Sequence, residues 1–381
     1  MKICDCVKDA VWYDPRVRKQ IDEYIRAGHT VEAVGVKEPR YDEGEVEKVP
    51  CRVSLAGIDD KYYNKPNLFQ KIYREIKTNV DMYHLIMSTK PDVIHANDLN
   101  ALVPAYRAAK KLKCGIIYDT HEIFLENPWM VRNKIGKLIW SVIEKRLIRR
   151  VDLVVSVSHA AADYLKKEYR LDRIMVVTNC VDSSAAVFGN TPAAPLQILN
   201  HGQFYEGRGY DILVDVAPLI ADKKDLQIVL RGFGRLEKEL REKVSENGIT
   251  NLIFAPPVKV YELISAASVA WVGVAITESI SLNFELSVSN KLFEYAAAGL
   301  PVIMSDIPEH RYLNEKYHFG VILKSNSPQD IAEAINKLYY DRDFYNSCRK
   351  NAYRLTSEVN WQTEFKKLMD FEASVVGKNK N

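Results

Sequence analysis

The sequence lacks the features that mark several special classes of protein. With 17 Gly and 15 Pro among 381 residues, it has too little of either for a collagen-like or low-complexity chain. No apolar run reaches about 18 residues, so no helix is expected to span a membrane. Asp5, Asp9 and Asp14 lie where a secretory signal needs an apolar core. We therefore expect a globular protein of the cytoplasm.

Two nucleotide-binding fingerprints and a metal-binding pattern are also missing. The first glycine is Gly28, so the Gly-x-Gly-x-x-Gly turn of dinucleotide-binding domains cannot follow the first predicted strand. No Gly-x4-Gly-Lys-Ser/Thr occurs, which excludes a P-loop NTPase. The six cysteines include no Cys-x-x-Cys pair, and Cys4-x-Cys6 lies in an alternating apolar stretch. We expect buried, reduced thiols, as in a reducing cytoplasm.

The charges balance over the whole chain but not locally. There are 53 Lys and Arg against 50 Asp and Glu, yet residues 128–150 alone carry seven Lys and Arg and one Glu. Apolar side chains such as Trp129, Ile139 and Trp140 alternate with these cations. One interpretation is a helix that lies on an anionic membrane surface. The other is a first-domain helix whose apolar stripe packs on the core while its cations are solvated. No module typical of nucleic-acid binding accompanies the segment.

Short β-branched runs alternate with amphipathic segments along the chain, which predicts an α/β fold with parallel sheets and helices on both faces. In the first half we expect strands at residues 2–7, 30–36, 92–96, 115–119, 153–157 and 174–178, and helices at 15–27 and 100–112. In the second half we expect strands at 196–200, 227–231, 251–255, 269–274 and 301–305, and helices at 211–221, 235–246, 260–266, 290–298 and 328–339.

A small, polar, Pro-containing stretch at 181–195 is typical of a linker. It separates a domain of residues 1–180 from one of residues 196–356, which a segment of residues 357–381 follows. Both domains are expected to be Rossmann-like. Because ligands of such sheets collect at the carboxyl ends of the strands, we expect the binding site in a cleft between the domains.

Two turns in the second half suit a phosphate-containing ligand. Residues 200–209 (NHGQFYEGRG) follow a strand, and Arg208 offers a cation at the start of the next helix. Residues 230–234 (LRGFG) again join a strand to a helix. An ordinary glycine turn with a solvated arginine would explain the first motif alone. Two such turns in one domain are more informative than either.

A third motif, residues 287–303 (SVSNKLFEYAAAGLPVI), predicts a helix that carries Lys291 and Glu294 on one face. A lysine in the first turn lies at the positive end of the helix dipole, an unfavourable place unless an anion is nearby. Glu294 can accept two hydrogen bonds from a diol such as a ribose. The alternative interpretation is a Lys–Glu pair on the surface, three residues apart.

With these motifs the chain resembles glycosyltransferase family 4. The glycine turns and the helix KLFEYAAAGLPVI are similar to the donor-binding half of that family. The first half matches the family's order of motifs with YDPRV (13–17), AGH (27–29), PDVIHAND (91–98), YDTHE (118–122), VSVS (155–158) and VTN (177–179). Nearly the whole chain is covered, and Trp361 lies in what looks like the family's closing helix, which returns to the first domain.

The resemblance implies the GT-B fold and a retaining transferase that moves a sugar from a nucleotide sugar to a glycan, as in bacterial surface-polysaccharide assembly. Arg208 and Lys291 would bind the donor diphosphate and stabilise it as it leaves, and Glu294 would bind the ribose. His121 would face the transferred sugar. The nucleotide pocket would be lined by Gly202, Gln203, Gly209, Gly232 and Gly234. The nucleotide sugar would be a co-substrate, with no further cofactor and no metal.

Two positions depart from the family pattern. Gln203 stands where the family usually has Arg, and Leu286 stands eight residues before Glu294, where the family has another Glu. We expect Lys291 to replace the lost cation. Because this glutamate is missing, one alternative to an active transferase is a catalytically silent partner subunit that binds a sugar nucleotide. Another alternative is an epimerase with the GT-B fold. By residue type alone, His121 also suits a structural histidine.

The basic segment 128–150 also bears on where the enzyme is located in the cell. If it binds an anionic membrane, the enzyme is peripheral at the inner membrane face and acts on a lipid-linked glycan.

Overall fold

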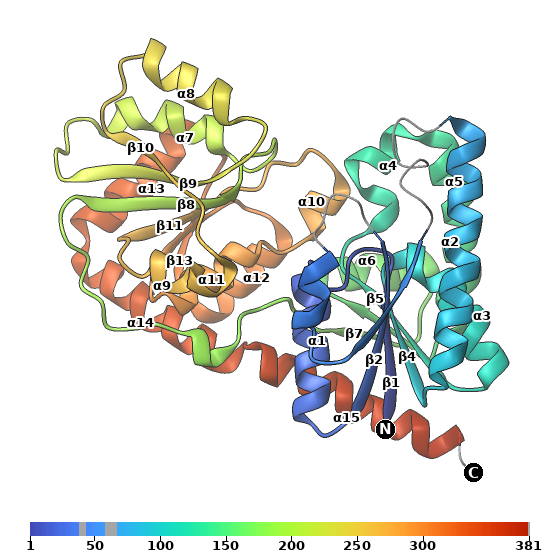
Figure 1. The fold of residues 1–381 in the computed structure, drawn as a ribbon. Coiled ribbons are helices and arrows are strands. Elements are labelled where there is room, and N and C mark those ends of the chain that lie inside the picture. Colours follow the sequence, from blue (N-terminus) through green and yellow to red (C-terminus); the bar gives the residue numbers. More distant parts are fainter. Residues whose placement is uncertain (38–42, 58–66, 380–381) are drawn as a thin grey trace. The chain divides into compact units, whose positions relative to one another are not determined.

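The structure, a computed structural model, describes residues 1–37, 43–57 and 67–379. The chain divides into two compact units (Figure 1). The first contains Met1–Thr178 and Glu364–Asn381, and the second contains Asn179–Thr363. In the described part of the chain, no helix is long and apolar enough to cross a membrane.

The first unit is built on a seven-stranded sheet in the order β3-β2-β1-β4-β5-β6-β7, with every pair parallel. Its strands are β1 (Lys2–Val7), β2 (Thr30–Val36), β3 (Arg52–Ala56), β4 (Val93–Asn97), β5 (Gly115–Thr120), β6 (Leu153–Ser156) and β7 (Ile174–Val176). Its helices are α1 (Pro15–Arg26), α2 (Leu68–Thr89), α3 (Asp98–Leu112), α4 (Pro128–Arg132), α5 (Lys134–Leu147), α6 (His159–Tyr169) and most of α15 (Trp361–Asn379). Strand β3 and helices α2 and α6 are not among the elements predicted from the sequence.

Local signals explain where the first helices begin. Asp14 caps α1 by accepting hydrogen bonds from the backbone N–H groups of Arg16 and Val17, and Pro15 supplies the fixed φ suited to a first helical residue. Asn67 and Gln70 form a reciprocal capping box at the start of α2. These contacts satisfy backbone donors that a helix leaves without partners in its first turn.

Successive residues of β1 point to opposite faces of the first sheet. Cys4 and Cys6 join the apolar core under α2 and α3, and all six cysteines of the chain are free thiols. Asp5, between them, faces the other side together with His95 and Asp119, and all three are fully buried. The first unit therefore contains an apolar layer on one face and a buried polar layer on the other.

The second unit is built on a six-stranded parallel sheet in the order β10-β9-β8-β11-β12-β13. Its strands are β8 (Leu196–Gln203), β9 (Leu226–Phe233), β10 (Leu252–Ala255), β11 (Val272–Ala275), β12 (Val302–Met304) and β13 (Gly320–Ile322). Its helices are α7 (Tyr210–Val216), α8 (Glu237–Glu246), α9 (Leu263–Ala267), α10 (Leu282–Leu286), α11 (Asn290–Ala297), α12 (Pro308–Tyr317), α13 (Pro328–Tyr340) and α14 (Arg342–Glu358). The expected α/β fold of two Rossmann-like domains is confirmed.

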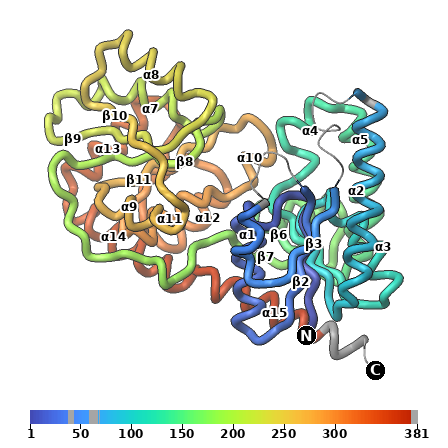
Figure 2. The backbone as a smooth tube through the Cα atoms, in the orientation of Figure 1, coloured from blue at the N-terminus to red at the C-terminus, as the bar shows by residue number. Residues whose placement is uncertain are grey.

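The helices of the second unit cover both faces of its sheet (Figure 2). Two apolar layers pack between the sheet and these helices, one on each face. Ile198 of β8 packs in the layer that contains α7 and α13, whereas its neighbour Leu199 packs in the layer that contains α11 and α14. The next two residues of β8, Asn200 and His201, are also buried. They lie where the strand approaches the first glycine turn.

Candidate functional site

The ends of β8 and β9 lie unusually close together in the second unit. Gly202 is paired with Gly232 in the parallel ladder, and a Cβ atom on Gly232 would lie 1.8 Å from the carbonyl oxygen of Gly202. A Cβ atom on Gly234 would lie 2.6 Å from the backbone nitrogen of Phe204. Both glycines also have positive φ, which other residues rarely adopt. The Gly-x-Gly pattern is therefore required by the backbone itself.

The turn that follows β8 presents Arg208. Gly209 has a φ of 68°. Its N–H donates to Oε1 of Glu278 at 3.3 Å. The N–H of Glu278 donates in turn to the carbonyl of Gly207 at 3.1 Å. Glu278 thus braces the turn from the loop after β11. The Arg208 guanidinium lies 5.0 Å from the ring centroid of Phe284 in α10, a cation–π contact that limits its freedom.

Lys291, in the first turn of α11, is buried in the second unit. Its Nζ donates to Oδ1 of Asn200 at 2.5 Å and lies 3.5 Å from the hydroxyl of Tyr210. Burial, and after it the positive charge of Arg208, lower the pKa of Lys291 to about 7, although the carboxylate of Glu294 opposes the shift. A solvated Lys–Glu surface pair is therefore excluded for this lysine. Lys291 and Arg208 are close enough to repel one another, as two ligands of one anion would be.

Glu294, one turn later on α11, is held by a histidine. Nε2 of His201 lies 2.7 Å from Oε2 of Glu294, and the backbone N–H of His201 donates to the hydroxyl of Tyr295 at 3.0 Å. The His201 side chain is 2% exposed, whereas that of Glu294 is 21% exposed. One edge of the Glu294 carboxylate is therefore fixed by the protein, while part of it stays accessible.

Two consecutive residues of β8 position the two predicted ligands on α11. Asn200 accepts from Lys291 and donates to the backbone carbonyl of Arg208 at 3.3 Å, while His201 contacts Glu294. The sequence analysis quoted both residues within a motif but gave neither a role. The available signal was a polar Asn-His pair at the end of an otherwise apolar strand. Together, these contacts gather two cations and one carboxylate, which suit an anion beside a diol.

The lost family glutamate has no substitute at its own position. Leu286 is the last residue of α10, and Glu285 precedes it. Glu278 is engaged by the turn at Gly209, as described above. Gln203, the other departure, is exposed at the end of β8. Its backbone carbonyl accepts from the N–H of Tyr205 at 3.0 Å.

His121, in the first unit, follows β5 and lies among polar groups. Its Nε2 lies 2.9 Å from Oδ1 of Asn97, whose amide group donates to Asp5, so Nε2 carries the proton and donates. Its Nδ1 lies 3.6 Å from carboxylate oxygens of both Asp14 and Asp98. Burial raises the pKa of Asp98 to about 7. A proton can therefore be exchanged near neutral pH beside His121, which is 13% exposed.

A buried polar network lies next to the strand end that carries His121. Arg16 of α1 forms a two-pronged ion pair with Asp119, through Nε at 3.0 Å and Nη2 at 2.9 Å. Although burial opposes it, this guanidinium holds the pKa of Asp119 well below its usual range. His95 lies 3.2 Å from Asp119 and 2.8 Å from the hydroxyl of Tyr24, which donates to Glu372 of α15. The network ties the C-terminal helix to the core of the first unit.

Replacing Arg16 by Ala is expected to destabilise the first unit by about 3–5 kcal/mol, because the Asp119 carboxylate would remain buried without its main partner. Urea unfolding followed by circular dichroism measures this change. Lys366→Ala is the control, since Lys366 and its partner Asp370 are both exposed and their ion pair should contribute less than about 1 kcal/mol. Equal losses in the two variants would contradict a structural role for the buried pair.

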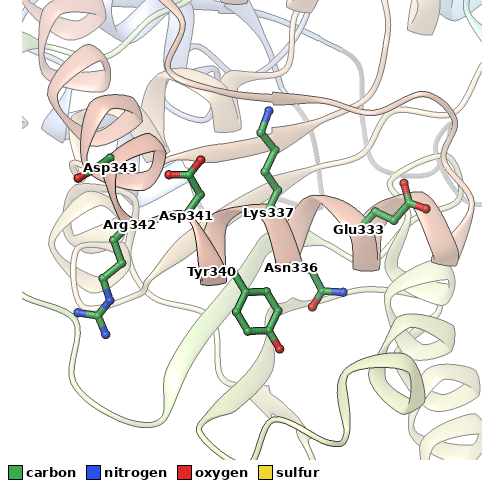
Figure 3. A pocket seen from close by; sticks show the side chains of 7 residues that line it. All are labelled: Glu333, Asn336, Lys337, Tyr340, Asp341, Arg342 and Asp343. Carbon is green, nitrogen blue, oxygen red and sulfur yellow. The ribbon is translucent and has the colours of Figure 1, made fainter.

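A separate surface pocket of about 740 Å³ lies where α13 meets α14 (Figure 3). Its walls include Asp341 and Asp343, an Asp-x-Asp spacing that can serve metal ions in other settings. Here Asp341 caps α14 by accepting from the N–H of Phe344 at 2.9 Å. Within the described residues, no group of three or more His, Cys, Asp or Glu side chains could hold a metal ion. The pocket contains none of the site residues expected from the sequence.

Comparisons with known proteins bear on the family and the fold of the chain. Residues 16–185 match the family model described as Glycosyltransferase Family 4, and residues 195–341 match the model described as Glycosyl transferases group 1. O-antigen chain mannosyltransferase C of Escherichia coli is 22% identical over 251 residues, which cover 63% of this chain and 65% of that protein. The chain therefore aligns with slightly less than two thirds of that relative.

Solved structures share the fold at low sequence identity. Sucrose-phosphate synthase from Thermosynechococcus elongatus has a TM-score of 0.79 and 14% identity, with 99% of this chain and 100% of that chain covered. Anabaena HepE, solved in complex with UDP and glucose, has a TM-score of 0.74 and 16% identity, with 98% and 100% covered. The positions of His121, Arg208, Lys291 and Glu294 fall within these two matched ranges. The chain is a glycosyltransferase with the GT-B fold, in which a family 4 domain precedes a group 1 domain.

Proposed function

We propose that this enzyme transfers a sugar, with retention of anomeric configuration, from a nucleotide sugar to a glycan during assembly of a cell-surface polysaccharide. The observation that carries the proposal is the cluster of Arg208, Lys291 and Glu294 in the second unit. Arg208 and Lys291 bind the donor diphosphate, and Glu294 accepts hydrogen bonds from the ribose hydroxyls. The turns that contain Gly202, Gln203, Gly209, Gly232 and Gly234 line the nucleotide pocket. His121, from the first unit, contacts the transferred sugar.

The proposed reaction needs charge stabilisation more than a protein nucleophile. The bond between the anomeric carbon and the β-phosphate oxygen breaks, and negative charge develops on the departing diphosphate. Arg208 and Lys291 stabilise that charge in a site from which water is excluded. The acceptor oxygen forms its bond on the same face of the sugar, and its proton passes to the departing phosphate. In this scheme the two cations neutralise the charge of the departing diphosphate, as a bound metal ion does in other transferases.

The relatives support the donor and the pathway in this proposal. The Escherichia coli relative is named an O-antigen chain mannosyltransferase, and the Anabaena structure contains UDP and glucose. We propose a nucleotide-sugar donor and a glycan acceptor, which is lipid-linked if the basic segment 128–150 attaches the enzyme to the inner membrane face. The alternative of a silent nucleotide-binding subunit is motivated by Leu286 and predicts donor binding without sugar transfer.

Thermal-shift screening against UDP- and GDP-sugars, followed by an assay of donor hydrolysis and transfer, tests the proposal. We expect one donor class to raise the melting temperature and to be turned over. Binding without turnover would favour the silent subunit, and no binding of any nucleoside diphosphate sugar would contradict the proposed function.

The affinity for a nucleoside diphosphate is expected to fall as the pH rises above about 7. Lys291 has a pKa of about 7 in the free protein, and the bound diphosphate raises it, so binding above this pH requires uptake of a proton. The dissociation constant should increase by up to about tenfold per pH unit above pH 7 until the pKa of the complex is reached.

Calorimetry with UDP between about pH 6 and pH 9, in buffers of different ionisation enthalpy, measures both the affinity and the proton uptake. The Lys291→Met variant should bind more weakly and show no such dependence, because the titrating ammonium group is absent. An unchanged slope in Lys291→Met would assign the titration to another group.

A further inference from the structure

Two helices of the first unit present apolar stripes to solvent. On α2, the side chains of Phe69, Ile72, Tyr73, Ile76 and Val80 are between 43% and 83% exposed. Their spacing of three or four residues places them on one face of the helix. The apolar stripe of a surface helix normally faces the core, so a stripe exposed over three turns indicates a partner that covers it.

The second stripe lies on α5, within the basic segment. Ile135, Leu138, Ile139 and Val142 follow the same spacing and are between 55% and 76% exposed. Trp140, on another face of α5, packs against the core instead. Both earlier interpretations of 128–150 therefore hold in part, because α5 packs on the core through one face and leaves a second apolar face exposed.

The two stripes lead into one groove. A groove of about 780 Å³ is lined by Val80 and Tyr83 of α2, by Ile143 of α5 and by the exposed face of α3. Val80 is the last residue of the α2 stripe, and Tyr83, three residues later, extends that stripe by one turn. Figure 1 shows α2 and α5 beside α3 in the first unit. The apolar surface is thus one continuous feature made from segments distant in sequence.

Cations line this groove. Arg107, Lys110 and Lys111 contribute from α3 and Arg146 from α5, and among the described residues its lining includes no Asp or Glu. The one carboxylate of 128–150, Glu144, is buried and accepts hydrogen bonds from the hydroxyls of Tyr118 and Tyr169. The segment therefore buries its one carboxylate, whereas its cations are exposed apart from Lys137, which is half-buried and pairs with Glu126.

We propose that α2, α3 and α5 form one docking surface for an anionic phospholipid bilayer, in which the two apolar stripes enter the interface and the basic groove receives lipid phosphates. The inference rests on the proposed function in that a lipid-linked acceptor would lie in such a membrane. Exposed aromatic residues such as Phe69, Tyr73 and Trp129 suit the boundary between headgroups and acyl chains.

Charge selects this occupant over a second copy of the chain. Two copies that met through this surface would bring Arg107, Lys110, Lys111 and Arg146 toward the same cations of the partner copy, which opposes association. An anionic bilayer satisfies the cations and the apolar stripes together, and each cation near such a surface strengthens attachment by about fivefold.

Sedimentation with vesicles of phosphatidylcholine, with or without about 30% phosphatidylglycerol, tests the proposal on the full chain. We expect binding to the anionic vesicles alone, reduced at high salt. Inorganic phosphate should release no more protein than chloride of equal ionic strength, because the lipid headgroups are held within the bilayer surface.

Variants separate the contributions of the two helices and the groove. The triple variant Phe69→Ser, Ile72→Ser, Ile76→Ser keeps every charge and should weaken vesicle binding by at least about tenfold. The variant Lys110→Gln, Lys111→Gln, Arg146→Gln should weaken binding to anionic vesicles by a similar factor. Val260→Ser with Tyr261→Ser, exposed apolar residues of the second unit, is the apolar control, and Lys238→Gln with Lys324→Gln is the charge control.

The affinity for UDP, measured on the same preparations, should be unchanged in all these variants. Unchanged affinity shows that the variants are folded, and it separates a failure of membrane binding from a failure of the proposed function. Equal vesicle binding by the α2 triple variant and the wild type would overturn the two-helix surface. Binding to neutral vesicles alone would overturn the role of the cations. A dimer in sedimentation velocity that the α2 variant abolishes would identify a second copy as the occupant and would also overturn the proposal.

Discussion

Replacing Arg208 by Ala is expected to lower kcat/KM for sugar transfer by about 30- to 1,000-fold, which corresponds to roughly 2–4 kcal/mol of transition-state stabilisation. The guanidinium lies on the turn braced by Glu278 and is held against Phe284, so it is already positioned to meet the departing diphosphate. The variant also loses the cation–π contact with Phe284, and thermal unfolding measures that effect on stability separately from activity. A steady-state transfer assay measures the effect.

Arg241→Ala is the matched control for this variant. Arg241 lies on α8, where it pairs with Glu237 at 2.9 Å and stacks on Phe254, and it takes no part in the proposed site. Transfer should be unaffected in this control. If Arg208→Ala kept full activity, the assignment of the diphosphate site to this turn would be wrong.

Replacing Glu294 by Ala should weaken donor binding by about 100-fold or more, because two charge-assisted hydrogen bonds to the ribose, each worth roughly 1.5–3 kcal/mol, would be lost. The variant also removes the partner of the buried His201, which should cost about 1–3 kcal/mol of stability. Titration with UDP at a temperature well below the melting transition measures the loss of affinity separately from the loss of stability.

Glu294→Gln separates the two effects. A glutamine oxygen can still accept from Nε2 of His201, so stability should be largely restored, while the neutral amide binds the diol more weakly than the carboxylate. We expect intermediate affinity with near-normal stability. Wild-type affinity in Glu294→Ala would remove this residue from the nucleotide site and leave it as a structural partner of His201.

The fold was predictable because its signals are local. Alternating β-branched runs and amphipathic segments specify strands and helices of a parallel α/β protein, and the alternation within β1 separates the apolar Cys4 and Cys6 from the polar Asp5. Helix α2 was missed although its apolar residues, such as Phe69, Ile72 and Ile76, recur at helical spacing after the Asn67–Gln70 capping box, so this signal was available in the sequence.

The site was predictable in its ligands but not in the contacts that hold them. Lys291 and Glu294 lie on one helix, so their common face follows from their spacing. Their partners Asn200 and His201 are more than 90 residues away, and only the folded chain brings them together. The low pKa of Lys291 has the same origin, because burial beside Tyr210 and Arg208 is not readable from a lysine in a helix.

His121 illustrates the same limit in the first unit. The family pattern singles it out, but the groups that surround it come from two other segments: Asp14 before α1, and the adjacent Asn97 and Asp98 where β4 passes into α3. Residue type alone suggested a structural histidine. The surrounding carboxylates give it a chemical environment that the sequence did not indicate.

A crystal structure of the enzyme with a bound nucleoside diphosphate tests the central claim most directly. The account predicts the β-phosphate oxygens within about 3 Å of both the Arg208 guanidinium and the Lys291 ammonium, with the ribose hydroxyls on the accessible oxygen of Glu294. A diphosphate bound away from these three side chains, or a ribose that does not contact Glu294, would contradict it.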